Sequence, residues 1–376
     1  MMPRRIIVSM HRLSPEHLQI DKPLPWDVYD AQGQLLLRKG YLVEKDRQIE
    51  MLLERGMFVD AEQFKASRDD DKPAAPVFNP FWLWDDIFKK LTRILKNIEQ
   101  VDDFADSIEA MASLLQFLSD KDADAGISVL LLLDTGKYPV AQSLHTAVVC
   151  ELVAKRMGWS QADRLSLVSA AMTMNVGMME LQGWLVNQNT PLTDEQRQQI
   201  NHHPQVSHDM LKAAGVTDSK WLTAVLQHHE RRGGKGYPHK VMQPDPMAEL
   251  IHLADVFCAK VSPRAYRKAL APNQAAKELF LDDGGEGNPL PAMIIKEVGI
   301  FPPGSFVKLQ NGETAVVVRR GQTANTPIVF SLVSGQGVPF VEPMRRDSSR
   351  KDYTIVSIVP KDKIMIRLNP AKLWGY

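Results

Sequence analysis

The chain has 376 residues, of which 44% are hydrophobic and 24% charged, as in an ordinary globular protein of two or three domains. Basic and acidic residues number 45 each, so the net charge is zero and gives no indication of binding to DNA or to an acidic membrane surface. The sequence has no run of about 18 apolar residues, so we expect no membrane span. It shows no signal-peptide pattern, and its two cysteines stand in apolar stretches, which together predict a cytoplasmic protein.

Residues 1–65 predict a small α/β module. Strand patterns over residues 26–30 and 35–38 flank a turn, a helix pattern covers residues 46–55, and a third short strand falls at 57–59. A sensory or docking role and a structural capping role both fit such a module.

A polar, proline-rich linker over residues 66–80 leads into a long-helix segment, residues 81–125. An aromatic cluster at its start, with Trp82 and Trp84, is expected to fasten this helix to its own domain. The helix itself is predicted as one continuous element over residues 85–118.

Apolar residues in this helix recur at alternating spacings of four and three over about four heptads. The residues of this seam are Ile87, Leu91, Ile94, Ile98, Val101, Ala105, Ile108, Ala112 and Leu115. Such a seam is typical of a coiled coil and indicates a homodimer through residues 87–115. Further apolar residues widen the stripe and favour burial within the chain's own domain instead, and the two interpretations are left open.

The rest of the chain predicts a helical domain over residues 126–300, followed by a β-rich appendage over residues 301–376. Within the helical domain, Thr193 and Gln196 form a capping-box pattern at the start of one helix. In the appendage, Asn311–Gly312 is a strong hairpin turn. The predicted fold class is therefore mainly α, a helical bundle core with a small α/β module before it and a small β appendage after it.

The most informative stretch is residues 227–238, where the adjacent pair His228 and His229 closes an apolar helix and a glycine-rich loop follows. Adjacent side chains on a helix diverge by about 100°, so both imidazoles reach one ion only where the helix ends. The glycines of the loop allow the backbone to bend there at little steric cost. Seven of the ten histidines lie between His202 and His252.

Five short motifs appear in a fixed order along the chain. They are His145, His203–Pro204, His228–His229–Glu230, Gly236–Tyr237–Pro238 and Ala254–Asp255. This order resembles the HD-GYP family, a helical branch of the HD phosphohydrolases that acts on cyclic di-GMP with a two- or three-metal centre. The resemblance covers roughly residues 133–299, includes Arg264, Tyr266 and Arg267, and implies an HD-GYP-like helical bundle.

The resemblance also assigns the remaining site residues. It implies a surface that contacts substrate or partner, formed by Gly234, Gly236, Tyr237, Pro238, Arg264 and Arg267. The ligands it implies are cyclic di-GMP and, through the Gly-Tyr-Pro loop, a diguanylate cyclase of the GGDEF type. Small modules like residues 1–65 precede many HD-GYP domains.

The sequence departs from the family at its name-giving motif. Met174 stands where the family has the histidine, Asn175 where it has the aspartate, and Met178 where it has a lysine. An asparagine offers one neutral carbonyl oxygen and cannot bridge two cations as a carboxylate does. A methionine thioether is a poor ligand for iron or manganese, and losing the lysine removes a cation that would face a substrate phosphate. These three positions are therefore interpreted as a degenerate catalytic centre.

The surviving residues leave two interpretations of the metal content. His203, His228 and His229 are expected to bind at most one divalent ion, either iron, manganese or zinc, as three imidazoles do in mononuclear sites. His145 and Asp255 are further candidate ligands, with too few partners for a second ion. The alternative is an empty pocket, in which the histidines bond to one another and to Glu230 and Asp255 pairs with Arg264 or Arg267.

Two functions follow from these alternatives. The first is a degenerate HD-GYP signalling protein of the cyclic di-GMP pathway, which binds a ligand or partner and has lost most or all phosphodiesterase activity. The second is an active metal-dependent phosphodiesterase that hydrolyses cyclic di-GMP to pGpG or GMP.

Overall fold

A computed structural model gives the fold of the chain. It describes residues 10–13, 23–43, 57–61, 63–64, 78–133, 136–264, 267–283 and 288–376. The chain divides after Phe78 into two compact units, which are described separately. The predicted helix over residues 46–55 and most of the predicted linker lie outside the described residues.

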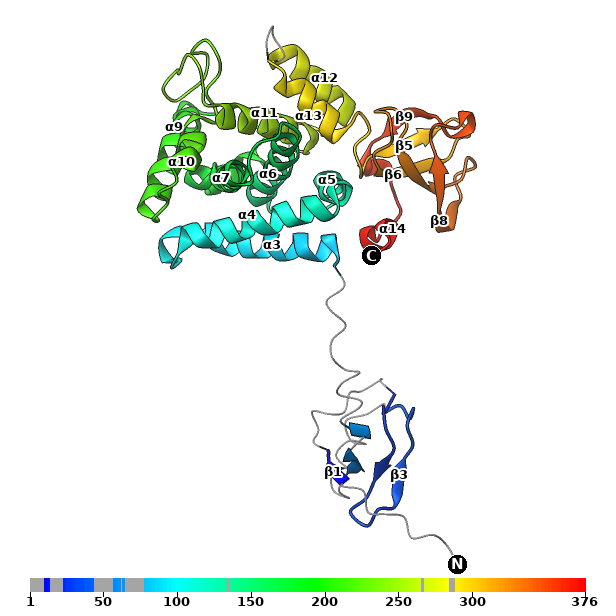
Figure 1. Ribbon diagram of the computed structural model, residues 1–376. Helices are drawn as coiled ribbons and strands as arrows, with labels where there is room; N and C mark the ends of the chain where they lie inside the picture. Colours follow the sequence, from blue (N-terminus) through cyan, green and yellow to red (C-terminus); the bar gives the residue numbers. More distant parts are fainter. Residues whose placement is uncertain are drawn as a thin grey trace, which may run out of the picture. The chain divides into compact units, whose positions relative to one another are not determined.

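The first unit contains a small antiparallel sheet with strand order β1-β4-β2-β3 (Figure 1). The strands are β1 (Met10–Arg12), β2 (Val28–Tyr29), β3 (Leu35–Leu37) and β4 (Phe58–Asp60). The side chain of Asp30 closes the β2–β3 turn, because its Oδ1 accepts hydrogen bonds from the backbone nitrogens of Gln32 and Gln34, at 2.9 and 2.8 Å. The predicted hairpin and the third short strand are thus confirmed.

The second unit is a helical body with a sheet beside it (Figure 1). Its first helices are α3 (Pro80–Lys96), α4 (Phe104–Lys121), α5 (Ala123–Leu132), α6 (Tyr138–Arg156) and α7 (Gln161–Thr173). They are followed by α8 (Met179–Leu185), α9 (Asp194–Ala213), α10 (Ser219–Gln227), α11 (Pro246–Val261), α12 (Pro272–Asp283) and α13 (Leu290–Val298). Helix α6 packs against both α7 and α11 and is buried along almost its whole length. The described part of the chain contains no helix that is both long and apolar enough to cross a bilayer.

The prediction of one long helix over residues 85–118 is wrong. Helix α3 ends at its C-cap Asn97, a short 3₁₀ turn η2 (Ile98–Gln100) follows, and Asp103 adopts the left-handed conformation that aspartate tolerates. The chain therefore turns back, and α4 lies beside α3 (Figure 1).

The predicted seam is the buried inner face of this pair of helices. Ile87, Leu91, Ile108 and Leu115 are each 0% exposed within the single chain. A period of 3.5 residues places apolar side chains on the inner face of an intramolecular helix pair just as it does in a coiled-coil dimer. Burial within the chain's own domain is therefore the correct interpretation, and a homodimer stalk through residues 87–115 is not.

The C-terminal sheet is antiparallel with strand order β8-β7-β6-β5-β9. Its strands are β5 (Phe306–Leu309), β6 (Thr314–Arg319), β7 (Ile328–Val333), β8 (Pro339–Asp347) and β9 (Ile355–Val359). The predicted Asn311–Gly312 turn joins β5 to β6, with Gly312 at a φ of 83°. The short helix α14 (Pro370–Trp374) then returns to the helical body, where the ring of Trp374 meets the ring of Phe81 edge to face. The predicted fold class, mainly α with small sheets at both ends, is confirmed.

Candidate metal centre

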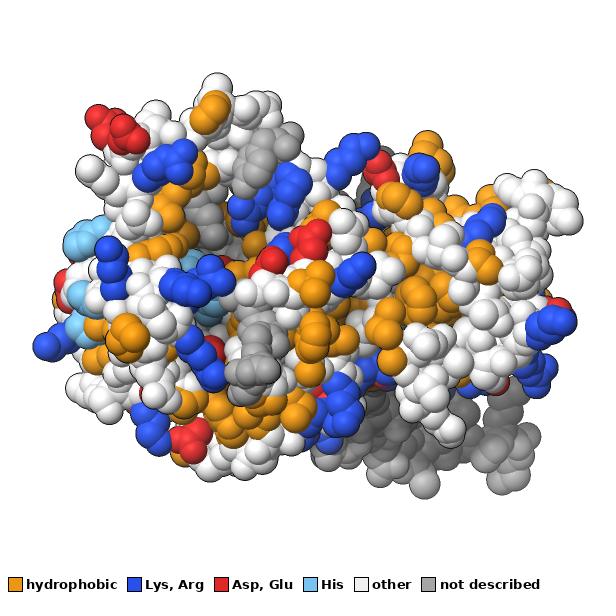
Figure 2. All heavy atoms as spheres, turned by 90° about the horizontal axis from the view of Figure 1, so that it is seen from above, with side chains coloured by type: hydrophobic (Ala, Val, Ile, Leu, Met, Phe, Trp, Pro, Cys, Tyr) orange, Lys and Arg blue, Asp and Glu red, His pale blue; other side chains and the backbone are white. Residues whose placement is uncertain are grey.

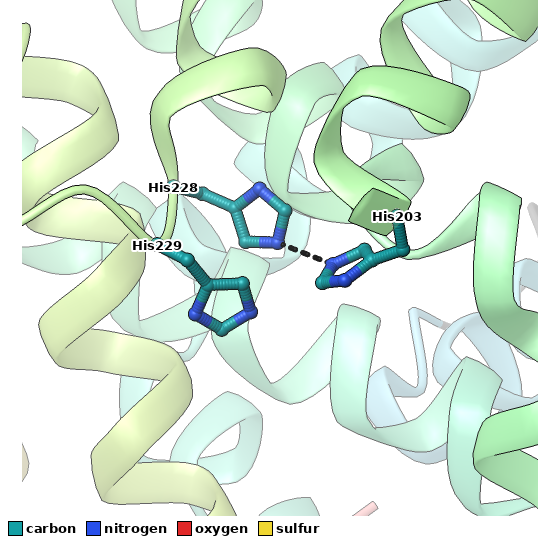
Figure 3. Close-up of side chains that lie close together, drawn as sticks. All are labelled: His203, His228 and His229. Carbon is teal, nitrogen blue, oxygen red and sulfur yellow. Dashed lines mark hydrogen bonds between the residues drawn. The ribbon is translucent and has the colours of Figure 1, made fainter. Parts of the chain in front are cut away.

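Three imidazoles gather where α9 passes the end of α10 (Figure 3). His203 lies within α9, His228 is the C-cap of α10, and His229 follows it. One ring nitrogen from each lies within 4.8 Å of the others, a spacing that fits one metal ion. We call these three residues the imidazole cluster.

Helix α9 offers His203 a backbone acceptor because of the proline that follows. Pro204 has no N–H, so the carbonyl of Ile200, four residues earlier, lacks its usual helical donor. The Nδ1 of His203 takes that place, at 2.6 Å from the Ile200 oxygen. The predicted capping box of Thr193 and Gln196 fixes the start of the same helix, with both reciprocal bonds at 3.1 Å.

The end of α10 serves His228 in a similar way. The last four carbonyls of a helix have no intrahelical partner, and that of Val225 is one of them. The Nδ1 of His228 lies 2.6 Å from the Val225 oxygen. Two different backbone features, a proline and a helix end, thus supply the same kind of acceptor.

These bonds decide which nitrogen of each ring is free. A carbonyl oxygen only accepts, so the Nδ1 atoms of His203 and His228 carry the protons and their Nε2 atoms carry lone pairs. The two Nε2 atoms face each other at 3.0 Å. Metal-binding histidines are normally oriented by such a bond from their second nitrogen. The donor set therefore fits a cation between the rings.

Burial keeps the imidazole cluster in its neutral, ligating form. Burial lowers the pKa of His203 to about 4. It also lowers the pKa of His228 and of His229 well below the ordinary value, and the neighbouring histidines add to the effect. At neutral pH the rings do not have to lose a proton before they bind a metal ion.

The glycine-rich loop covers His229. The backbone nitrogen of Tyr237 donates to the carbonyl of His229 at 3.2 Å, and the two rings stack with centroids 4.7 Å apart. Gly236 permits this close return, because a Cβ there would collide with the backbone of residues 229–231.

Glu230 organises this loop. It is 1% exposed, and its two carboxylate oxygens accept from the backbone nitrogens of His239 and Val241, at 2.6 and 3.0 Å. The predicted alternative, in which Glu230 bonds to the histidines, does not match these contacts. Arg232 fastens the loop to α11 through a two-pronged ion pair with Glu249.

The two further candidate ligands are His145 from α6 and Asp255 from α11. Together with Asn175, which follows α7, we call them the α6–α7–α11 set. The ring of His145 stacks on Trp84 of α3 with centroids 5.7 Å apart, and burial lowers the pKa of His145 to about 4. Asn175 is 2% exposed, and its Oδ1 has no hydrogen-bond partner among the described residues. Its neighbour Met174 is fully buried.

Asp255 has a partner that sequence reasoning missed. Its Oδ1 accepts from Nε2 of Gln142 at 2.8 Å, while burial raises its pKa. Arg264 donates to the hydroxyl of Tyr138 at 2.8 Å, and Arg267 donates to the carbonyl of Ala259 at 2.6 Å. The charge of Arg264 partly opposes the rise in the pKa of Asp255. The sequence feature that could have pointed to Gln142 as a partner is its polar side chain, three positions before His145 in a buried helix. Tyr266 lies outside the described residues.

Gly177 brings the residues that follow α7 against α9. Its nitrogen donates to Oγ of Ser207 at 3.0 Å, and a Cβ at Gly177 would come within 3 Å of Ser207 and Val206. The chain after α7 is therefore held close to the helix that carries His203. Met178 is half-buried in the 3₁₀ turn η3 (Val176–Met178).

Comparison with known proteins identifies the fold family. Residues 128–284 match the HD domain family. Residues 128–284 therefore form a domain of the HD family, in agreement with the resemblance that the motifs indicated. This HD domain includes the helices that carry the imidazole cluster and the α6–α7–α11 set.

Several known proteins are similar to part of this chain. The chain is 26% identical over 239 residues to the cyclic di-GMP phosphodiesterase PA4108 of Pseudomonas aeruginosa, covering 62% of this chain and 56% of that protein. It is 24% identical to the cyclic di-GMP phosphodiesterase PdeB of Borreliella burgdorferi, covering 49% of each. The chain thus spans about half the length of these relatives. A solved structure of Bd1817, an HDG"Y"P protein from Bdellovibrio bacteriovorus, aligns with a TM-score of 0.49 at 17% identity, over 77% of this chain and 98% of that one.

Proposed function

We propose that this chain is a degenerate HD-GYP signalling protein of the cyclic di-GMP pathway. It binds one divalent metal ion through the imidazole cluster, recognises the nucleotide or a protein partner, and has lost most or all phosphodiesterase activity. The observation that carries the proposal is Asn175, which is buried and neutral at the family's aspartate position, beside a fully buried Met174.

The chemistry of hydrolysis gives the reason. A bound metal centre in this family supplies an activated water and neutralises charge on the phosphate. His203, His228 and His229 can hold one ion by neutral nitrogens. Asn175 cannot supply the anionic bridge for a second ion, and Met174 offers only a thioether. Losing one positioned electrostatic group commonly costs about 10² to 10³ in rate, and losing the bridge should cost more.

The proposed recognition surface combines the loop over His229 with residues that follow α11. It consists of Gly234, Gly236, Tyr237 and Pro238 in the loop, with Arg264 and Arg267 after α11. Lysine and arginine side chains lie beside histidine side chains on one face of the molecule, which suits an anionic ligand (Figure 2). The candidate ligands are cyclic di-GMP, as the names of the relatives suggest, and a GGDEF-type protein at the Gly-Tyr-Pro loop.

A second candidate function is an active phosphodiesterase that produces pGpG or GMP. The metal-competent geometry of the imidazole cluster and the names of the relatives favour it. It requires the cluster to activate water without an aspartate at position 175.

One set of measurements on the purified full chain distinguishes the two functions. We expect elemental analysis to find one metal equivalent, calorimetry to detect cyclic di-GMP binding, and chromatography to find little or no pGpG or GMP with manganese or ferrous iron. The variant Met174→His/Asn175→Asp/Met178→Lys should then bind more metal. Two or more equivalents in the wild type, with rapid turnover that His228→Ala abolishes, would establish the second function instead.

A further inference from the structure

A fourth histidine, His252, contacts the imidazole cluster from α11. It is half-buried, one turn before Asp255 on the same helix. Its Nδ1 lies 3.2 Å from the carbonyl oxygen of His228. Its ring stands nearly perpendicular to that of His229, with centroids 6.0 Å apart and an interplanar angle of 82°.

The bond to the His228 carbonyl acts at the point where the chain leaves α10. His228 is the C-cap of α10, so no backbone N–H of that helix donates to its carbonyl oxygen. A carbonyl only accepts, so Nδ1 of His252 is the donor. The side chain of His228 is fixed to Val225 and its main chain to His252. The backbone turn that lets His228 and His229 point at one ion is therefore fastened on both sides.

Two of the rings that contact His229 come from outside the imidazole cluster. Tyr237 stacks on it at 4.7 Å, and His252 meets it at a right angle. A ring packed between a stacked neighbour and a perpendicular one has little freedom to rotate about its side-chain torsions. His252 therefore contacts both His228 and His229.

We propose that His252 is a positioning residue of the metal centre. It orients His228 through the main chain and His229 through the ring contact, and it does not bind the ion itself. Among the described residues, the group whose ligand atoms lie within 4.8 Å of one another comprises His203, His228 and His229 only. This inference rests on the proposed one-metal function.

The expected size of the effect follows from other metal sites, where removing a residue that orients a ligand costs about 10- to 100-fold in metal affinity. Asparagine places an amide N–H near the position of Nδ1, so His252→Asn should keep much of the bond to the His228 carbonyl. His252→Leu keeps the side chain's bulk and removes the donor. A rescue by asparagine distinguishes positioning from mere packing, because packing alone would favour the leucine.

The test measures zinc affinity of the full chain by competition with a chromophoric chelator. We expect His252→Leu to weaken binding about 10- to 100-fold while one equivalent still binds at saturation, and His252→Asn to recover most of the loss. His202→Leu is the matched control, because His202 is adjacent to His203 on α9 but exposed, and it should leave the affinity unchanged. Thermal unfolding of the metal-free variants confirms that each is folded.

X-ray absorption of the cobalt-loaded protein supplies a readout that does not depend on affinity. We expect three imidazole nitrogens on the metal in the wild type, and the same number in both His252 variants at saturation. Four nitrogens in the wild type that fall to three in His252→Leu would make His252 a ligand and overturn the proposal. An unchanged zinc affinity in His252→Leu would also overturn it. Cyclic di-GMP hydrolysis by the wild type refutes the proposed function alone, whereas a wild type that binds no metal refutes both.

Discussion

The imidazole cluster and the α6–α7–α11 set belong to one HD domain but differ in what holds their side chains. In the cluster, backbone carbonyls of Ile200 and Val225 orient two imidazoles so that their free nitrogens converge. In the α6–α7–α11 set, side chains from other helices contact two of the three members, since Gln142 bonds to Asp255 and Trp84 stacks on His145. The buried atoms Nε2 of His145 and Oδ1 of Asn175 have no hydrogen-bond partner among the described residues. The first region presents converging nitrogens that suit a cation, whereas the second is held by contacts between side chains of different helices.

This difference indicates which substitutions leave the imidazole cluster oriented for a metal ion. Orientation by the backbone depends on Pro204 and on a helix end, which side-chain changes within the α6–α7–α11 set do not alter. The α6–α7–α11 set is held by side chains, and Met174 and Asn175 are buried at the end of α7.

The most disruptive change should be removal of the indole over His145. Trp84 is 1% exposed, and Trp84→Ala should lower the free energy of unfolding by about 3–5 kcal/mol through the cavity it leaves. Metal content should stay the same under conditions where the variant is folded. Trp82 is 71% exposed two positions away, so Trp82→Ala is the control and should change stability by less than about 0.5 kcal/mol. Urea unfolding measures both, and loss of metal in folded Trp84→Ala would show that the two regions are coupled.

The sharpest functional contrast lies between His228 and Asp255. His228→Ala removes a proposed ligand and should weaken zinc binding by more than the roughly 100-fold that losing an orienting partner can cost. Asp255→Asn preserves the shape of its side chain and should leave the affinity unchanged, because the proposal places Asp255 outside the single site. Chelator competition tests both variants, and equal losses in the two would mean that the metal centre spans both regions.

The glycine-rich loop offers a smaller test of the cluster. Gly236→Ala forces a Cβ into the backbone of residues 229–231, and such overpacking typically costs about 1–3 kcal/mol. Zinc affinity should fall together with stability, since His229 loses the contact with Tyr237. The neighbouring Lys235 is exposed, so Lys235→Ala should change neither. Calorimetric unfolding with and without zinc separates the two effects, and a stable Gly236→Ala with wild-type affinity would contradict this role of the loop.

The mildest effect concerns pH. Burial lowers the pKa of His145 to about 4, below the ordinary histidine value, so between these two pH values the unfolded chain binds a proton that the folded chain does not. Stability from this residue is therefore complete above about pH 6.5 and falls as the pH drops toward 4, by up to about 1.4 kcal/mol per pH unit. His145→Leu should reduce that slope by about one proton. Urea unfolding of metal-free protein at several pH values measures the slope, and an identical slope in the variant would show that His145 takes up its proton in the folded state.

Local sequence patterns predicted much of the fold. The Thr193–Gln196 capping box, the Asn311–Gly312 turn and the hairpin around Asp30 all depend on residues within a few positions of one another, and all three are present. The histidine pair at a helix end was also predictable, because helix geometry and the following glycines restrict where adjacent rings can converge.

The continuous seam over residues 87–115 could not be assigned from its period alone. An intramolecular helix pair and a dimer require the same apolar spacing, and only the left-handed Asp103 after Asn97 decides that the chain turns back. Sequence reasoning favoured neither outcome, and it missed the break because neither glycine nor proline marks it.

The sequence by itself indicated the family and determined the order of the histidines and the presence of asparagine at position 175, because these are properties of residue identity and spacing. Only the tertiary structure decided which partners those residues have. The bond from Gln142 to Asp255 joins residues 113 positions apart, and the contacts of Trp84 with His145 and of His252 with the imidazole cluster likewise cross between helices. Such contacts depend on how helices pack, and a local pattern carries no information about the side chain that arrives from a distant helix.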